Sequence, residues 1–136
     1  MRDERGAVTA FVACFAVALI AVFGLVVDGG LVLATRRQAF NEADAAARFG
    51  AQAVDESALR RGGPLALDAS EAERRALRHL AVKGLDGTVA VDGERIIVTV
   101  TTSRSLSVLG FTGLGPIEVR ATGTARAVQG VREEGD

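Results

Sequence analysis

The stretch AVTAFVACFAVALIAVFGLVV, residues 7–27, decides how this chain is organised, because it contains no charged residue. At a helical rise of about 1.5 Å per residue it covers about 30 Å, the hydrocarbon thickness of a bilayer. In lipid, every backbone polar group has to be paired within the segment, and a lone apolar run achieves this only as a helix. We therefore predict one transmembrane helix over residues 7–27.

Two other roles for this stretch are weaker. A cleavable secretory signal could end at Val32-Leu33-Ala34, but the apolar run is longer than the usual core of such signals, and Asp28 intervenes before that site. Lipidation at Cys14, the only cysteine, would leave too short an apolar run before it. A thiol packed on a helix is the ordinary explanation for Cys14. We therefore expect the anchor to be retained.

One face of the predicted helix carries mostly small residues at spacings of three or four: Ala10, Cys14, Val17, Ala21, Gly24 and Asp28. Small faces let helices approach closely in lipid, although an Ala-rich span always contains some such stripe. Asp28 is the first charge after the span. Its carboxylate is either solvated at the membrane edge or in contact with a partner's arginine or amino terminus. The candidate partner contacts on this face are Cys14, Ala21, Gly24 and Asp28.

Beyond the span, the chain predicts one long helix from Leu31 to about Arg61, stopped by Gly62-Gly63-Pro64. Gly29-Gly30 predicts a bend or a loosened turn before it. One face of the long helix is small and suited to close packing on a sheet. Its members are Ala39, Ala43, Ala46, Ala47, Gly50, Ala53, Val54 and Ala58.

A second, short helix is predicted within residues 65–83. Ser70 and Glu73 have the spacing of a capping box, and Gly84 is placed to end the helix. Its apolar stripe consists of Ala72, Ala76, Leu77, Leu80 and Ala81. His79, the only histidine, is expected on the opposite, polar face as a solvated side chain.

The hydrophobic period then changes to two, which indicates strands. Residues 88–91 and 95–102 flank Asp92-Gly93, a strong hairpin signal, and residues 117–127 alternate apolar and polar side chains. Residues 105–115 between them predict a short helical turn or apolar loop, with Phe111 in the core, and the tail from Gly130 to Asp136 looks frayed. The fold class is α+β: a transmembrane helix continuing into a long helix, a second short helix, and an antiparallel sheet of three or four strands packed on the long helix.

Composition argues against several functions. With 16 basic and 17 acidic residues and no basic cluster, the chain lacks the footprint of a nucleic-acid-binding protein. The single cysteine and single histidine fit no catalytic set and no metal site, and no glycine-rich phosphate loop is present. We predict no catalytic residue, no cofactor, no metal and no small-molecule substrate.

Several motifs, in order, resemble one known family: Arg5-Gly6-Ala7-Val8-Thr9, the apolar span, Val27-Asp28-Gly29-Gly30, Arg36-Arg37-Gln38 and Ala43-Asp44-Ala45-Ala46-Ala47. Over about residues 5–54 the chain resembles TadE/TadG-like proteins of the tight-adherence (Flp) pilus assembly system. The later ATGTARAV, residues 121–128, also fits the usual close of that family.

This resemblance implies a pilin-like, single-pass protein of the cell membrane, a minor pilin or pseudopilin-like component of pilus assembly. Residues 1–6 would be cytoplasmic, 7–27 transmembrane, 28–129 an extracytoplasmic α+β domain, and 130–136 a flexible tail. The implied partners are the lipid bilayer and other pilus-assembly membrane proteins or pilin-like subunits, met through the N-terminal helix, with Asp44 as a further candidate contact.

The resemblance also raises a processing site between Gly6 and Ala7. Members cut by a prepilin peptidase carry a glutamate five residues after the cleavage glycine, whereas this chain has Phe11 there. The departure favours a permanently anchored accessory protein over a processed filament subunit. The alternative function is a membrane-anchored or secreted extracytoplasmic binding module unrelated to pili.

Overall fold

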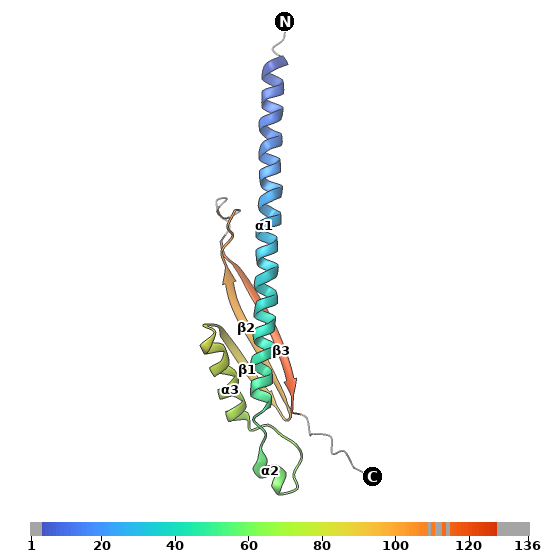
Figure 1. Ribbon diagram of the computed structural model, residues 1–136, viewed down its shortest axis with the longest axis vertical. Coiled ribbons are helices and arrows are strands. Elements are labelled where there is room, and N and C mark those ends of the chain that lie inside the picture. Colours follow the sequence, from blue (N-terminus) through green and yellow to red (C-terminus); the bar gives the residue numbers. More distant parts are fainter. Residues whose placement is uncertain (1–3, 109, 111–112, 114, 128–136) are drawn as a thin grey trace, which may run out of the picture. The chain divides into compact units, whose positions relative to one another are not determined.

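The computed structural model describes residues 4–108, 110, 113 and 115–127, which form three helices and three strands (Figure 1). In chain order these are α1 (Glu4–Ala51), α2 (Glu56–Arg60), α3 (Ala69–Val82), β1 (Asp86–Asp92), β2 (Arg95–Arg104) and β3 (Ile117–Arg126). The strands form one antiparallel sheet in the order β1-β2-β3. The α+β class, the long apolar helix and the three-stranded antiparallel sheet are as predicted.

The chain divides into two compact units. Unit 1 contains the chain up to Thr35 together with Ser103–Ile117, and unit 2 contains Arg36–Thr102 and the chain from Glu118 onward. Unit 1 therefore holds the predicted membrane span, and unit 2 holds the hydrophobic core.

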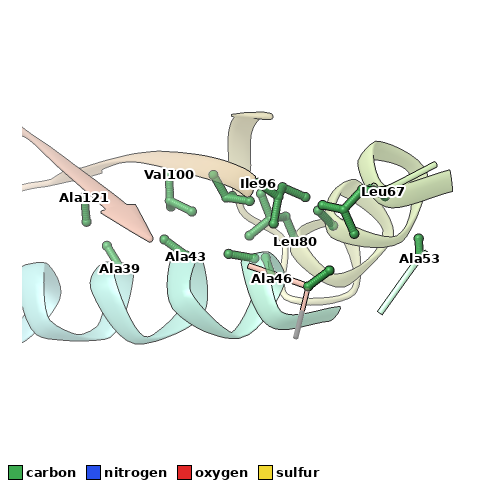
Figure 2. Close-up of a cluster of buried hydrophobic side chains, with 14 residues drawn as sticks. Ala39, Ala43, Ala46, Ala53, Leu67, Leu80, Ile96, Val100 and Ala121 are labelled. Carbon is green, nitrogen blue, oxygen red and sulfur yellow. The ribbon is translucent and has the colours of Figure 1, made fainter. Parts of the chain in front are cut away.

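The core of unit 2 lies between α1 and one face of the sheet, and alanine dominates the helix side of it (Figure 2). Ala39, Ala43 and Ala46 are at most 2% exposed, and they face a sheet layer that includes Ile96 and Val100, both fully buried. A methyl group added at Gly123 of β3 would overlap the main chain of Ala43 and Asp44. Helix and strand backbones are thus in contact here, which confirms that the small face of the helix packs against the sheet.

The hairpin between β1 and β2 follows the sequence signal. Asp92 pairs with Arg95, and Gly93 adopts a φ of 57°, a left-handed conformation that favours glycine. In β2, Ile96, Val98 and Val100 point to the core and alternate with less buried residues. The period-two pattern therefore assigned the two faces correctly.

The second helix starts earlier than its predicted cap. Asp68, and not Ser70, is the N-cap: its Oδ1 accepts a hydrogen bond from the N–H of Glu71 at 3.0 Å. Of the predicted stripe, α3 buries Ala72, Ala76 and Leu80, whereas Leu77 and Ala81 are exposed. The predicted stop is confirmed, since Gly84 follows the helix with a φ of 65°.

The long helix ends at Ala51, ten residues before the predicted stop at Arg61. Val54 forms an isolated antiparallel bridge with Leu67, and the N–H of Asp68 donates to the carbonyl of Ala53 at 2.8 Å. This pairing draws the chain out of the helix although its residues are good helix formers, so tertiary contacts override propensity. The short α2 follows, capped by Asp55.

Two other expectations concern the helix and the connection after β2. α1 continues through Gly29-Gly30 without interruption, so no loosened turn is present there. Ser105–Val108 is irregular and not helical. Phe111 and the predicted tail at residues 130–136 lie outside the described residues.

Candidate partner and membrane contacts

The first part of α1 exposes its large apolar side chains to its surroundings. Phe11 is 70% exposed. Ten other large apolar residues are more than half exposed: Val8, Val12, Phe15, Val17, Leu19, Ile20, Val22, Phe23, Leu25 and Val26. Soluble monomers rarely show a continuous apolar surface of this size. Among the described residues, one helix is long and apolar enough to cross a membrane, and it is this one. Its chemistry suits a lipid environment.

The stripe of small residues on this helix is divided in two. Cys14 and Ala21 are exposed, whereas Gly24 and Asp28 are buried. Gly29 and Gly30, in the same helix, are exposed and have no neighbour within 4 Å of an added methyl. Burial at Gly24 is therefore not a property of helical glycine. Ser103–Ile117 belongs to the same unit, and its Ser107 and Val108 bond to Asp28, one turn along the helix from Gly24.

The carboxylate of Asp28 is bonded within the chain. Its Oδ1 accepts hydrogen bonds from the N–H of Ser107 at 2.9 Å and from the N–H of Val108 at 3.1 Å, and its Oδ2 accepts from the N–H of Val108 at 3.0 Å. The residue is 3% exposed. The solvated alternative for Asp28 is therefore wrong. The carboxylate holds the connection between β2 and β3 against the helix.

Sequence reasoning did not find the partners of Asp28, and there is a physical reason. They are two main-chain N–H groups, about eighty residues along the chain, and a backbone group leaves no residue-type signal. Hydrogen bonds to a charged acceptor contribute about 1.5–3 kcal/mol each. The only available hint was an acid at the end of an apolar helix in a chain that has a second uncharged segment, residues 105–117.

The remaining candidate residues are Asp44, Gly6 and Ala7. Asp44, in unit 2, accepts a hydrogen bond from Nε of Arg48 at 2.9 Å, one turn along the same helix. Its main chain lies against Gly123, so it belongs to the helix–sheet packing. Gly6 and Ala7 are exposed on α1, and a methyl group added at Gly6 would meet nothing within 4 Å.

His79 is not the solvated side chain that the sequence predicted. Its side chain is 19% exposed, its Nε2 lies 3.1 Å from Oε2 of Glu42, and its ring stacks on Phe49 with centroids 4.8 Å apart. Nζ of Lys83 lies 3.6 Å from the other oxygen of Glu42. Both Glu42 and Phe49 come from α1, so the polar face of α3 meets a second helix that a helical wheel of α3 alone cannot show.

This cluster links α3 to α1 through polar contacts and ring stacking. No group of three or more His, Cys, Asp or Glu side chains is placed to hold a metal among the residues described. The carboxyl group of Glu42 lies beside the His79 ring and the Lys83 amino group at partly exposed positions, where such contacts are of modest strength.

Comparison with known proteins bears on the N-terminal region. Residues 6–53 match the family model described as putative Flp pilus-assembly TadE/G-like. No curated protein matches the chain, and no solved structure matches it. The matched range contains the exposed apolar helix, Asp28 and most of the small face that packs on the sheet. Over residues 6–53 the chain is therefore TadE/G-like, as its sequence motifs indicated.

Proposed function

We propose that this chain is a non-catalytic, permanently anchored component of tight-adherence pilus assembly, with a minor pilin- or pseudopilin-like architecture. One observation carries the proposal: the TadE/G-like region presents a helix whose large apolar side chains are exposed and whose composition suits a membrane span. In this arrangement residues 7–27 span the bilayer, residues 1–6 are cytoplasmic, and residues 28–129 form the extracytoplasmic domain.

The contact with other assembly proteins is proposed on the exposed part of the small stripe. Cys14 and Ala21 are exposed on the membrane helix, seven residues or about two turns apart, and small side chains permit close helix packing in lipid. Gly24 and Asp28 follow on the same stripe, but they are covered within the chain. We therefore propose the partner contact at Cys14 and Ala21 and not at Asp28.

The proposed role is structural and not catalytic. Three of its acidic side chains make contacts within the chain: Asp28 accepts from Ser107 and Val108, Asp44 pairs with Arg48, and Glu42 joins His79 and Lys83. A protein of this kind acts by presenting a helix in the membrane and a folded domain outside it.

Co-purification from cells that make pili tests this function. The full chain, tagged at its C-terminus, is solubilised from membranes in mild detergent, and the recovered proteins are identified by mass spectrometry. We expect pilus-assembly membrane proteins or pilin-like subunits among them. Recovery of none of these from piliated cells contradicts the proposal and favours a binding module unrelated to pili.

A matched pair of variants tests the helix face. Ala21→Leu enlarges an exposed residue of the small stripe and should lower partner recovery, because it separates the two helices. Val22→Leu makes a small enlargement at the next position, about 100° around the helix, and should leave recovery unchanged. Equal recovery with both variants would show that this face is not the contact.

A further inference from the structure

The segment Ser103–Ile117 contacts the helix next to the end of the proposed membrane span. This segment shares a compact unit with the chain up to Thr35. Gly24 and Asp28 are the helix positions buried in that unit. Gly24 lies inside the run proposed to span the membrane, and Asp28, one turn after Gly24, directly follows that run. Ser107 and Val108 bond to Asp28, so this part of the segment lies at the end of the proposed membrane span.

A non-helical backbone at that level has a specific requirement. Near hydrocarbon, N–H groups that lack water need protein acceptors, and irregular segments are tolerated only where such acceptors exist. Asp28 supplies them: its two carboxylate oxygens accept from the N–H groups of Ser107 and Val108 at 2.9–3.1 Å. This accounts for a buried acid directly after the uncharged run of residues 7–27.

The composition of the connection between β2 and β3 is compatible with a position at the membrane surface. No charged residue lies between Arg104 and Glu118. Leu106 and Val108, on either side of Ser107, are half-buried, so part of their apolar surface is exposed. On the helix, the next charges after Asp28 are Arg36 and Arg37, which suit a headgroup region.

We propose that Leu106–Val108 is a second membrane-contacting element, which lies in the lipid–water interface beside the anchor and is held there by the Asp28 carboxylate. The proposal rests on the membrane anchor of the proposed function. It adds that a part of the chain outside the TadE/G-like match also binds the bilayer interface. Apolar side chains at such a surface enter the boundary between headgroups and acyl chains by about 5–10 Å.

Depth-dependent fluorescence quenching tests the proposal on the full chain in phosphatidylcholine vesicles. Cys14 is the only cysteine, so a thiol-reactive fluorophore labels the native chain at this one position and reports on the anchor itself. In a Cys14→Ser background, Val108→Cys and Leu106→Cys place an environment-sensitive probe on the proposed element. Glu94→Cys, at an exposed position in the turn between β1 and β2, is the control. Quenchers are lipids brominated near the headgroup end of the acyl chains, lipids brominated midway along them, and aqueous iodide.

The expected result is a loss of fluorescence at positions 108 and 106 in the shallow-brominated lipid that is several-fold larger than at position 94, together with protection from iodide. Strong iodide quenching at both positions would place the element in water and overturn the proposal. Protection from lipid bromine and iodide alike would show that protein covers it, a second copy or a partner, and would also overturn it. Using two positions guards against a local disturbance by one substitution.

The native Cys14 probe separates this inference from the function on which it rests. If mid-chain bromine quenches Cys14 while positions 106 and 108 behave like position 94, the anchor stands and the interface contact alone is wrong. If Cys14 is not quenched by lipid bromine, the anchor is wrong, and both proposals fall.

Discussion

The two ends of α1 differ in whether their alanine residues are buried. Towards its start, the helix leaves large side chains such as Phe11 and Phe23 exposed, and the small Cys14 and Ala21 are exposed as well. Towards its end, Ala39, Ala43, Ala46 and Ala47 are buried, while Phe40 and Phe49 are about half exposed. Both parts are helical and rich in apolar residues, yet only the second part contributes to the core.

Residue size, more than hydrophobicity, marks the packed face of this helix. At Gly123 the strand backbone touches the helix backbone, and only alanine or glycine fits opposite it. Lipid sets no such limit, because fluid acyl chains adapt to side chains of any shape. A span with large residues on most faces, followed by a stripe of small ones, therefore predicts a change of surroundings along one helix.

The largest effect is expected from enlarging the packed face. Ala43→Leu should lower the free energy of unfolding by about 3 kcal/mol, because Ala43 is fully buried at a point where its main chain lies against Gly123 of β3. Urea unfolding of the full chain in detergent micelles, followed by circular dichroism, measures this. Ala21→Leu makes the same change at an exposed position and should stay within about 0.5 kcal/mol of the parent. Similar losses for both variants would remove the distinction between the two parts.

A substitution on the strand side of the same contact should lower the free energy of unfolding by a smaller amount. Gly123→Ala adds one methyl that overlaps the main chain of Ala43 and Asp44, and should cost about 2 kcal/mol. Gly115→Ala is the matched control, since a methyl there meets nothing within 4 Å. Thermal unfolding of the two variants in the same detergent compares them. Equal melting temperatures would show that the backbones are farther apart than described.

A smaller, local effect is expected at Asp28. Asp28→Ala removes the acceptor of the Ser107 and Val108 N–H groups, and should ease local opening by about 1.5 kcal/mol, or roughly tenfold faster amide exchange there. Hydrogen exchange read on peptides covering residues 105–108 detects this. Asp44→Ala, which removes only an ion pair with Arg48, should leave those peptides unchanged. Unchanged exchange in Asp28→Ala would contradict the assigned bonds.

The smallest effect concerns an exposed carboxylate, in contrast to the buried one. A hydrogen bond from the Ser57 hydroxyl, and then one from the N–H of Ala58, lowers the pKa of Asp55. A pKa lowered by folding means that the stabilisation is complete above the ordinary value of about 4 and is lost as the pH falls below it. Unfolding midpoints from pH 7 to 3 should therefore fall slightly more for the parent than for Asp55→Asn, which cannot titrate. Identical pH profiles would show that this cap does not contribute.

Much of the fold could be predicted because it depends on local patterns. The uncharged run from Ala7 to Val27, the Asp92-Gly93 turn and the alternation in β2 each specify one element by its own period. The small face from Ala39 to Gly50 also indicated its partner, since a stripe of alanine and glycine suits close approach to a sheet.

What could not be predicted depends on contacts between distant segments. The end of α1 at Ala51 follows from pairing of Val54 with Leu67, and the burial of His79 follows from Glu42 and Phe49 on another helix. The partners of Asp28 are backbone groups, which no residue pattern records. The sequence singled out Asp28 as a candidate contact, but it could not show that Ser107 and Val108 bind its carboxylate.

The most direct test of a retained membrane anchor is the intact mass of the protein taken from its native membrane. If the anchor is retained without processing, the measured mass should be that of the given chain, 14.1 kDa. A chain that lacks its first 34 residues would contradict the account, because the exposed apolar helix would then be a signal that is removed. A chain that lacks only residues 1–6 would contradict permanent anchorage without processing, and would show that a peptidase accepts Gly6 despite Phe11.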